Sequence, residues 1–186
     1  MTGRVLVAGV GNIFLGDDAW GVEVARELLE EELPPNVHVE DYGIRGVHLA
    51  YEILNGYDTV ILLDAAPREE EPGTVYVIEI DPRATAATSN EFGDPGAGVM
   101  DAHRMDPATV VALVSSLGGE IGRLLLVGCE PVSADEGADL SEPVRAAVGP
   151  GAMAVRRLLE EDWDRDAGGA NDSSVTKRVE DLDAVR

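Results

Sequence analysis

The sequence predicts a single-domain α/β protein, a three-layer sandwich whose mostly parallel, twisted sheet is flanked by helices. Its 186 residues suit one domain with a substantial core. Residues Arg4–Ala8 have the near-continuous apolar character of a parallel strand that is covered on both faces. Strand-like and helix-like segments then alternate, and this βαβαβ order implies a parallel sheet.

The first half of the chain predicts further strands separated by helices. Helical segments carry apolar residues at helical spacing and end at Pro34-Pro35 and Asn55-Gly56, whereas the second strand alternates polar and apolar residues. The expected elements are a helix over Trp20–Leu33, a strand over Val37–Tyr42, a helix over Val47–Leu54, a strand over Thr59–Leu63 and an edge strand over Thr74–Ile80.

The second half begins with a polar segment, Asp81–Asp101, which is long enough to be a functional loop or lid. Beyond it we expect a helix over Pro107–Leu117, a strand over Leu124–Val127 and a helix over Glu142–Leu159 that is kinked near Gly149-Pro150-Gly151. Residues 163–186 are charged and rich in small residues, so we expect a disordered tail after a domain formed by residues 1–162.

Composition excludes several partners. The net charge is −22 with only 14 basic residues, which argues against nucleic acid or an anionic membrane surface as the main partner. A cationic or metal-bearing partner suits this charge better, although the acids also serve solubility. Cys129 is the only cysteine, and no apolar segment near Met1 is long enough to span a membrane, so we expect a cytoplasmic protein.

Acidic residues and one histidine follow the predicted strands. The turn Gly9–Gly21 carries Asp17 and Asp18 where the first strand leads into a helix, Asp64 follows another strand, and His103 precedes a helix. Each alone suits a structural role, as a helix cap, a turn-forming acid or a surface histidine. Together, Asp18, Asp64 and His103 form a plausible divalent-metal site at the carboxyl edge of the sheet.

At these residues the chain resembles the hydrogenase maturation proteases, which remove a C-terminal peptide from the large subunit of nickel-iron hydrogenases after nickel insertion. The likeness extends over nearly the whole ordered chain. It is carried by Gly9-Val10-Gly11-Asn12 with Asp17-Asp18 and Gly21, by Asp41 and Gly43, by Asp64-Ala65, by His103 and by Leu126-Val127-Gly128-Cys129-Glu130-Pro131.

The resemblance implies a metal-dependent, nickel-recognising endopeptidase of aspartic or metallo type, acting on a hydrogenase large-subunit precursor. Asp18, Asp64 and His103 would contact the metal and act catalytically, with Asp41 beside the site and Asp17 less suited as a ligand. Nickel would be recognised in the substrate, and another divalent metal could occupy the isolated protein. The oligomeric state stays open, with a monomer expected.

Three residues depart from the family pattern as it is known in other members. Trp20 would place a bulky ring at the pocket edge, and Tyr42 and Arg45 occupy the turn after Asp41. Arg45 would pair with Asp41, with an acidic or C-terminal group of the partner, or in a weak ion pair at the rim.

A metal held by two acids and a histidine would activate water and polarise a peptide carbonyl, so no serine or cysteine nucleophile is needed. We therefore interpret Cys129 as a packed thiol. Two other functions stay open. A dinucleotide-binding enzyme would need a glycine where Phe14 stands, and Asp17-Asp18 would repel a pyrophosphate. A non-catalytic, metal-recognising chaperone for a metalloenzyme precursor would use the same residues as the protease.

Overall fold

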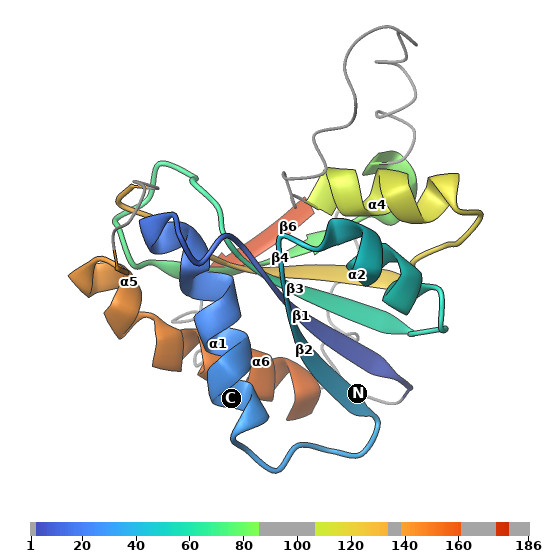
Figure 1. Ribbon diagram of the computed structural model, residues 1–186, viewed down its shortest axis with the longest axis horizontal. Helices are drawn as coiled ribbons and strands as arrows, with labels where there is room; N and C mark the ends of the chain where they lie inside the picture. Colours follow the sequence, from blue (N-terminus) through green and yellow to red (C-terminus); the bar gives the residue numbers. More distant parts are fainter. Residues whose placement is uncertain (1–2, 86–106, 134–138, 161–173, 179–186) are drawn as a thin grey trace, which may run out of the picture.

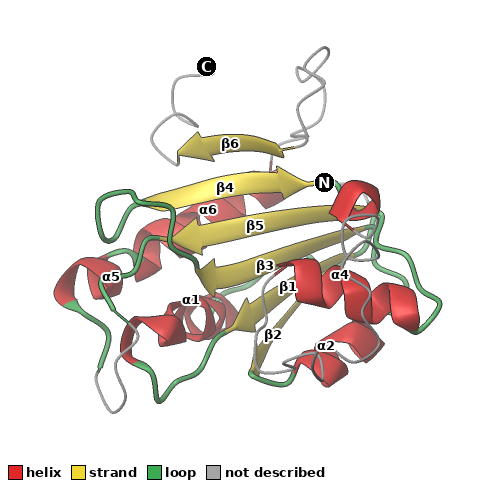
Figure 2. Cartoon of the chain, turned by 90° about the horizontal axis from the view of Figure 1, so that it is seen from above, coloured by secondary structure: helices red, strands yellow, loops and turns green. Residues whose placement is uncertain are grey.

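The computed structural model has three layers, with a mixed sheet between two layers of helices (Figures 1 and 2). It describes residues 3–85, 107–133, 139–160 and 174–178. The strands in these ranges are β1 (Val5–Val10), β2 (Val37–Gly43), β3 (Thr59–Ala65), β4 (Val75–Ile80), β5 (Arg123–Cys129) and β6 (Ser174–Arg178). Their spatial order is β2-β1-β3-β5-β4-β6; the first four in this order are parallel, and β4 runs antiparallel to both its neighbours. The predicted fold class is confirmed.

The helices cover both faces of the sheet. They are η1, a short 3₁₀ helix (Gly16–Ala19), α1 (Trp20–Leu29), α2 (Gly46–Ile53), α4 (Pro107–Ser116), α5 (Glu142–Ala146) and α6 (Val148–Glu160). The helices α1 and α6 pack on one face, and α2 and α4 pack on the other (Figure 2). The chain passes from β1 to β2 on one side of β1 and then to β3 on its other side. The order in which strands are added to the sheet therefore reverses at β1. In such sheets, ligands bind outside the carboxyl ends of the strands at this reversal.

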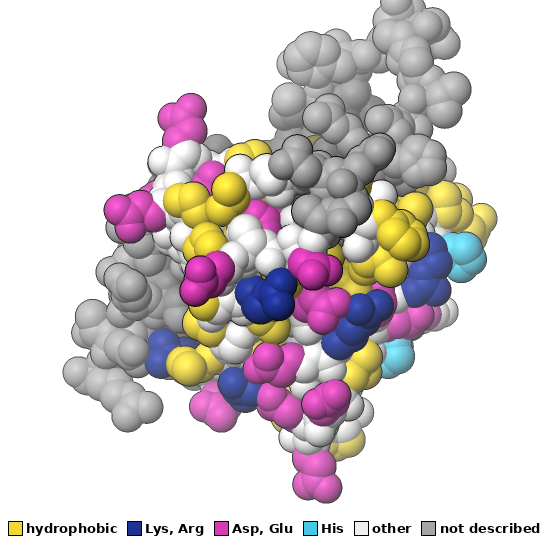
Figure 3. Space-filling view, turned by 60° about the vertical axis from the view of Figure 1, so that its left-hand side comes forward, with side chains coloured by type: hydrophobic (Ala, Val, Ile, Leu, Met, Phe, Trp, Pro, Cys, Tyr) yellow, Lys and Arg dark blue, Asp and Glu magenta, His cyan; other side chains and the backbone are white. Residues whose placement is uncertain are grey.

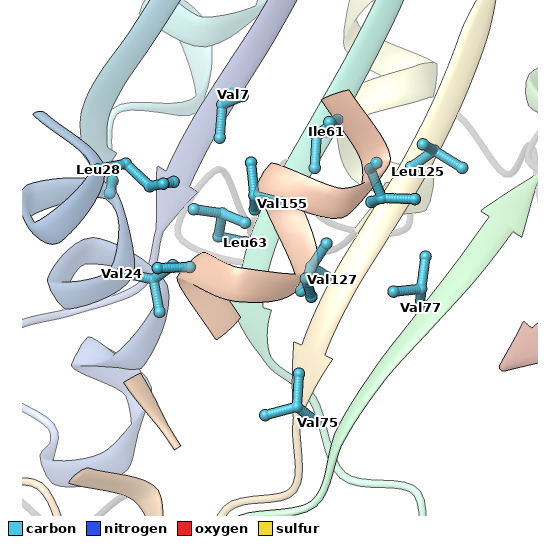
Figure 4. Close-up of a cluster of buried hydrophobic side chains, with 14 of the residues drawn as sticks. Val7, Val24, Leu28, Ile61, Leu63, Val75, Val77, Leu125, Val127 and Val155 are labelled. Carbon is cyan, nitrogen blue, oxygen red and sulfur yellow. The ribbon is translucent and has the colours of Figure 1, made fainter. Parts of the chain in front are cut away.

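Alternate residues of each strand enter two separate cores. On the α1 and α6 face, Val7, Ile61 and Leu125 point toward Leu28 and Val155 (Figure 4). On the opposite face, the intervening strand residues pack against α2 and α4; this second core includes Leu6, Val60, Leu62, Leu124, Leu126, Leu49 and Val114. Burial of each large apolar side chain contributes about 1.5–3 kcal/mol. The continuous apolar character of the strands therefore follows from burial on both faces.

Two expected helices have different bounds in the structure. The helix α1 ends at Leu29 instead of Leu33, because Glu30, Glu31 and Glu32 follow, and negative charge is unfavourable at a helix C-terminus. The expected helix Glu142–Leu159 is interrupted at Ala147 and forms α5 and α6. Pro150 lies in the first turn of α6, where its missing N–H is tolerated, but it cannot continue the hydrogen bonds of α5.

The C-terminal segment gives a further correction. Residues 174–178 form β6, which pairs with β4, so β4 is not the edge strand that we expected and these five residues are not disordered. The partial alternation of Ser174–Arg178 was hidden by the charged composition around it. The rest of the expected tail and residues 86–101 of the expected loop lie outside the described residues. Among the helices that the structure describes, none is long and apolar enough to cross a membrane.

Candidate functional site

The loop after β1 is fixed by Asn12. The Oδ1 atom of Asn12 accepts a hydrogen bond from the Phe14 N–H at 3.0 Å, and the Asn12 N–H donates to Oδ2 of Asp18 at 2.6 Å. Gly11 before it has a φ of 129°, and a Cβ there would overlap the carbonyl oxygen of Asp18. The Gly-Asn pair therefore folds the loop back on η1 and orients the Asp18 carboxylate.

Asp18 and Asp64 come from the two strands at the reversal point. Asp18 lies in η1 after β1, and Asp64 lies near the end of β3, the parallel neighbour of β1. The first turn of α1 packs directly on these strand ends, because a Cβ on Gly21 would overlap the Leu63 carbonyl oxygen. Both carboxylates are half-buried, and this packing holds them at the same edge of the sheet.

Asp17 has a different position, although it adjoins Asp18. Its side chain is 1% exposed and accepts hydrogen bonds from the backbone N–H groups of Val132 (2.8 Å), Ser133 (3.3 Å) and Ser141 (2.6 Å), and from the Ser141 hydroxyl (2.9 Å). Burial opposes ionisation of Asp17, but these hydrogen bonds outweigh it and lower its pKa. Asp17 therefore joins η1 to the segments on either side of residues 134–138, and it does not cap its own helix.

Asp41 lies on the other side of β1, in register with Gly9. Its Oδ2 is 3.3 Å from Nη2 of Arg26, which also contacts Glu23 at 2.6 Å. Of the pairings that the sequence left open for Arg45, the structure shows one with Asp41, made through its backbone carbonyl. The Arg45 guanidinium donates to the backbone carbonyls of Asp41 and Tyr42, because Arg45 directly precedes α2 and lies against the end of β2.

His103, the third expected metal ligand, lies outside the described residues. Within residues 3–85, 107–133, 139–160 and 174–178, no group of three His, Cys, Asp or Glu side chains is placed to hold a metal. In this part of the chain, Asp18 and Asp64 lie at the same edge of the sheet, and Asp41 lies on β2, the strand on the other side of β1. Carboxylates suit hard divalent ions, and a site for a nickel-like ion would need a nitrogen donor such as His103 in addition.

Two aromatic residues that the sequence suggested to lie near the site are instead buried. Trp20 is fully buried and packs against Gly151 of α6, so its ring is in the core and not at the pocket edge. Tyr42 is also buried, and burial raises its pKa. A large ring in the first turn of an amphipathic helix is placed by packing, which the local sequence does not reveal.

Cys129 is fully buried at the end of β5, and burial raises the pKa of its thiol to about 12. The interpretation of Cys129 as a packed thiol is supported, because a protonated, inaccessible thiol is a poor nucleophile.

The adjacent Glu130 had no assigned role beyond its place in the resemblance. It is 6% exposed and accepts a hydrogen bond from the Arg68 N–H at 2.6 Å, which holds the loop that follows Asp64. A charged residue directly after a buried strand was the signal for this role.

A family model described as hydrogenase maturation protease (HycI) matches residues 22–158. The hydrogenase expression/formation protein HupD of Rhizobium leguminosarum bv. viciae is 32% identical over 164 residues, which cover 86% of this chain and 75% of that protein. The chain belongs to the hydrogenase maturation protease family. The hydrogenase 2 maturation protease of Escherichia coli (strain K12) is also 32% identical, over 161 residues that cover 85% of this chain and 92% of that protein.

Solved structures agree with the family assignment. The hydrogenase maturating endopeptidase HybD from E. coli superposes with a TM-score of 0.66 and 26% identity, covering 96% of this chain and 99% of that one. Membership of this family, which the sequence predicted from the loop after β1 and from the strand ends, is therefore confirmed. The protein is an enzyme, a protease.

Proposed function

We propose that this protease removes the C-terminal extension of a nickel-iron hydrogenase large-subunit precursor after nickel insertion. The observation that carries the proposal is the placement of Asp18, in η1 after β1, and of Asp64, near the end of the adjacent parallel strand β3, at one edge of the sheet against which Gly21 packs closely. Family membership supplies the class of substrate.

We further propose that Asp18, Asp64 and His103 recognise nickel that the precursor already carries. Oδ2 of Asp18 is oriented by the Asn12 N–H, and Oδ1 has no hydrogen-bond partner among the described residues, so it is available to a cation. His103 would add the nitrogen donor that a nickel-like ion prefers over a site built of carboxylates alone. The isolated protein would hold another divalent metal at the same residues.

A divalent ion at this position would polarise the scissile carbonyl and promote ionisation of a water molecule. Asp18 and Asp64 would orient the substrate relative to that water, and a carboxylate on the rim would accept its proton. Asp41 would stand beside the site, with its carboxylate paired to the Arg26 guanidinium at 3.3 Å. Cys129 takes no part, because it is buried and protonated.

The test uses purified protein and a nickel-loaded hydrogenase large-subunit precursor, with the nickel-free precursor in parallel, followed by mass spectrometry. We expect loss of a C-terminal fragment from the nickel-loaded form only. Tight binding with no change of mass would instead indicate a chaperone, and cleavage of both forms would refute the recognition of nickel.

Variants then test the residues. Asp18→Ala, Asp64→Ala and His103→Ala should each lose nearly all processing while the circular dichroism spectrum and unfolding midpoint stay close to wild type. Glu32→Ala is the matched control, since it removes an exposed acid beyond the end of α1. Full processing by all three site variants would contradict the assignment.

A further inference from the structure

A groove opens beside η1, between α1 and the start of α5 and α6. Its volume is about 690 Å³, and Gly16 and Ala19, which flank Asp17 and Asp18, form part of its wall. Pockets of this size accommodate small ligands or a few side chains of a peptide. The groove therefore begins within one residue of the candidate site.

The two walls of the groove are tied together before any ligand arrives. Asp17 belongs to η1 on one wall, and its carboxylate binds the N–H and the hydroxyl of Ser141, the residue that precedes α5 on the other wall. A groove that is already formed binds an extended peptide without a cost for ordering its own walls. The hydrogen bonds of the buried Asp17 therefore favour binding in the groove as well as folding.

The lining combines apolar surface with negative charge. Ile13, Leu140 and Val148 supply the apolar part. Ile13 is 45% exposed on the loop that Asn12 holds, and the neighbouring Phe14 is 72% exposed. Exposed apolar side chains on a fixed loop beside a candidate site indicate a contact surface for a partner.

The charges favour a basic occupant. Both arginines of the groove are already engaged, Arg26 with Glu23 and Asp41 and Arg145 with the Leu140 carbonyl. Within the described part of the chain, no hydrogen bond or ion pair occupies the carboxylates of the other two acids in the lining, Glu27 and Asp139. The whole chain carries 36 acidic and 14 basic residues, and acidic side chains are spread over the face of the molecule that is turned forward in Figure 3.

We propose that this groove binds the precursor peptide next to the cleaved bond, with an apolar side chain on Ile13, Leu140 and Val148 and a lysine or arginine side chain beside Glu27 and Asp139. This assignment rests on the proposed function, because the position of the groove beside Asp18 is what identifies its occupant. It assigns substrate binding to residues outside the metal-recognising set.

The first test compares Ile13→Asp with Leu117→Asp in steady-state cleavage of the nickel-loaded precursor. Leu117 is 38% exposed and lies just beyond α4, on the opposite face of the sheet, so it is a matched control. We expect Ile13→Asp to raise KM about tenfold with kcat near wild type, as lost apolar contact predicts. An unchanged KM, or a fall in kcat alone, would overturn the proposal.

The second test reverses charge. Glu27→Lys combined with Asp139→Lys should raise KM at least as much, whereas Glu30→Lys combined with Glu32→Lys, which changes the net charge equally beyond α1, should not. An equal effect in both pairs would overturn the assignment of a basic side chain.

A binding measurement separates failure of this proposal from failure of the proposed function. A synthetic peptide spanning the precursor's cleavage site is titrated into wild type and Ile13→Asp by fluorescence anisotropy. If wild type binds the peptide more tightly than Ile13→Asp but cleaves no precursor, the groove is supported and the proposed reaction fails. If wild type cleaves the precursor and both proteins bind the peptide equally, the groove proposal fails alone.

Discussion

Replacement of Asp17 by alanine should destabilise the protein far more than the same replacement at Asp18. Asp17→Ala removes a carboxylate that is 1% exposed and that accepts hydrogen bonds from the part-buried N–H groups of Val132 and Ser141 at 2.8 and 2.6 Å. Each donor that loses its acceptor away from solvent costs about 1–3 kcal/mol, so these two groups alone predict a loss of about 2–6 kcal/mol, with a central value of about 4 kcal/mol. The longer 3.3 Å bond from Ser133 and the rotatable Ser141 hydroxyl add less.

The assay is urea unfolding followed by circular dichroism at neutral pH. Asp17→Asn keeps one acceptor oxygen and should lose about half as much free energy of unfolding, about 2 kcal/mol. Asp18→Ala removes one hydrogen bond, from the half-exposed Asn12 loop, and should lose about 1 kcal/mol or less. A loss below about 1 kcal/mol for Asp17→Ala would refute the view that these hydrogen bonds anchor η1 to the rest of the fold.

The pH dependence of this difference has a defined sign. Because the pKa of Asp17 is lowered in the folded protein, its ionised form stabilises the fold above the unfolded-state pKa of about 4. That contribution is lost as the pH falls through the lower, folded-state pKa. The difference in unfolding free energy between wild type and Asp17→Asn should therefore be constant near pH 7 and shrink below about pH 4. A difference that grows on acidification would contradict this reasoning.

Three further predictions concern the frame of the site. Gly21→Ala should destabilise the protein by about 3 kcal/mol, measured by urea unfolding, since the new methyl group meets the backbone carbonyl of Leu63, which cannot move without disturbing β3. Cys129 should resist alkylation in the native protein at pH 8, because its pKa is about 12 and it is buried, and thiol reagents should leave processing intact. Glu130→Leu should cost about 2 kcal/mol in urea unfolding, because the Arg68 N–H loses its acceptor, whereas Glu130→Gln should restore most of that stability.

The fold could be predicted from the sequence because its strongest signals are local. The strand Val5–Val10 is buried along its whole length, and this shows in the sequence as an uninterrupted apolar run. Proline and glycine residues marked most element ends. The segment Ser174–Arg178 carried no such signal, because an outer strand pairs through its backbone, which the residue composition does not reveal.

The site was predictable to the extent that topology alone places residues. Asp18 follows β1 and Asp64 lies near the end of β3, and these strands pair in parallel, so the order of elements implied a position at the same edge of the sheet. The ion pair of Arg26 with Asp41 joins a helix to a strand and depends on how α1 packs across β2, which spacing along the chain does not show.

One turn of 3₁₀ helix gives the adjacent residues Asp17 and Asp18 different roles, one in the stability of the fold and one in the proposed site. Successive side chains in such a helix point about 120° apart. The carboxylate of Asp17 is thereby directed into the protein toward Ser141, while the carboxylate of Asp18 stays on the rim beside Asn12. Because the interior hydrogen bonds hold η1 in place, the rim carboxylate need not be buried to be oriented, and it keeps an oxygen accessible for the proposed metal. A shift of one residue in this register would exchange the two roles, so the spacing from Gly11 to the acidic pair is constrained by the fold as much as by the reaction.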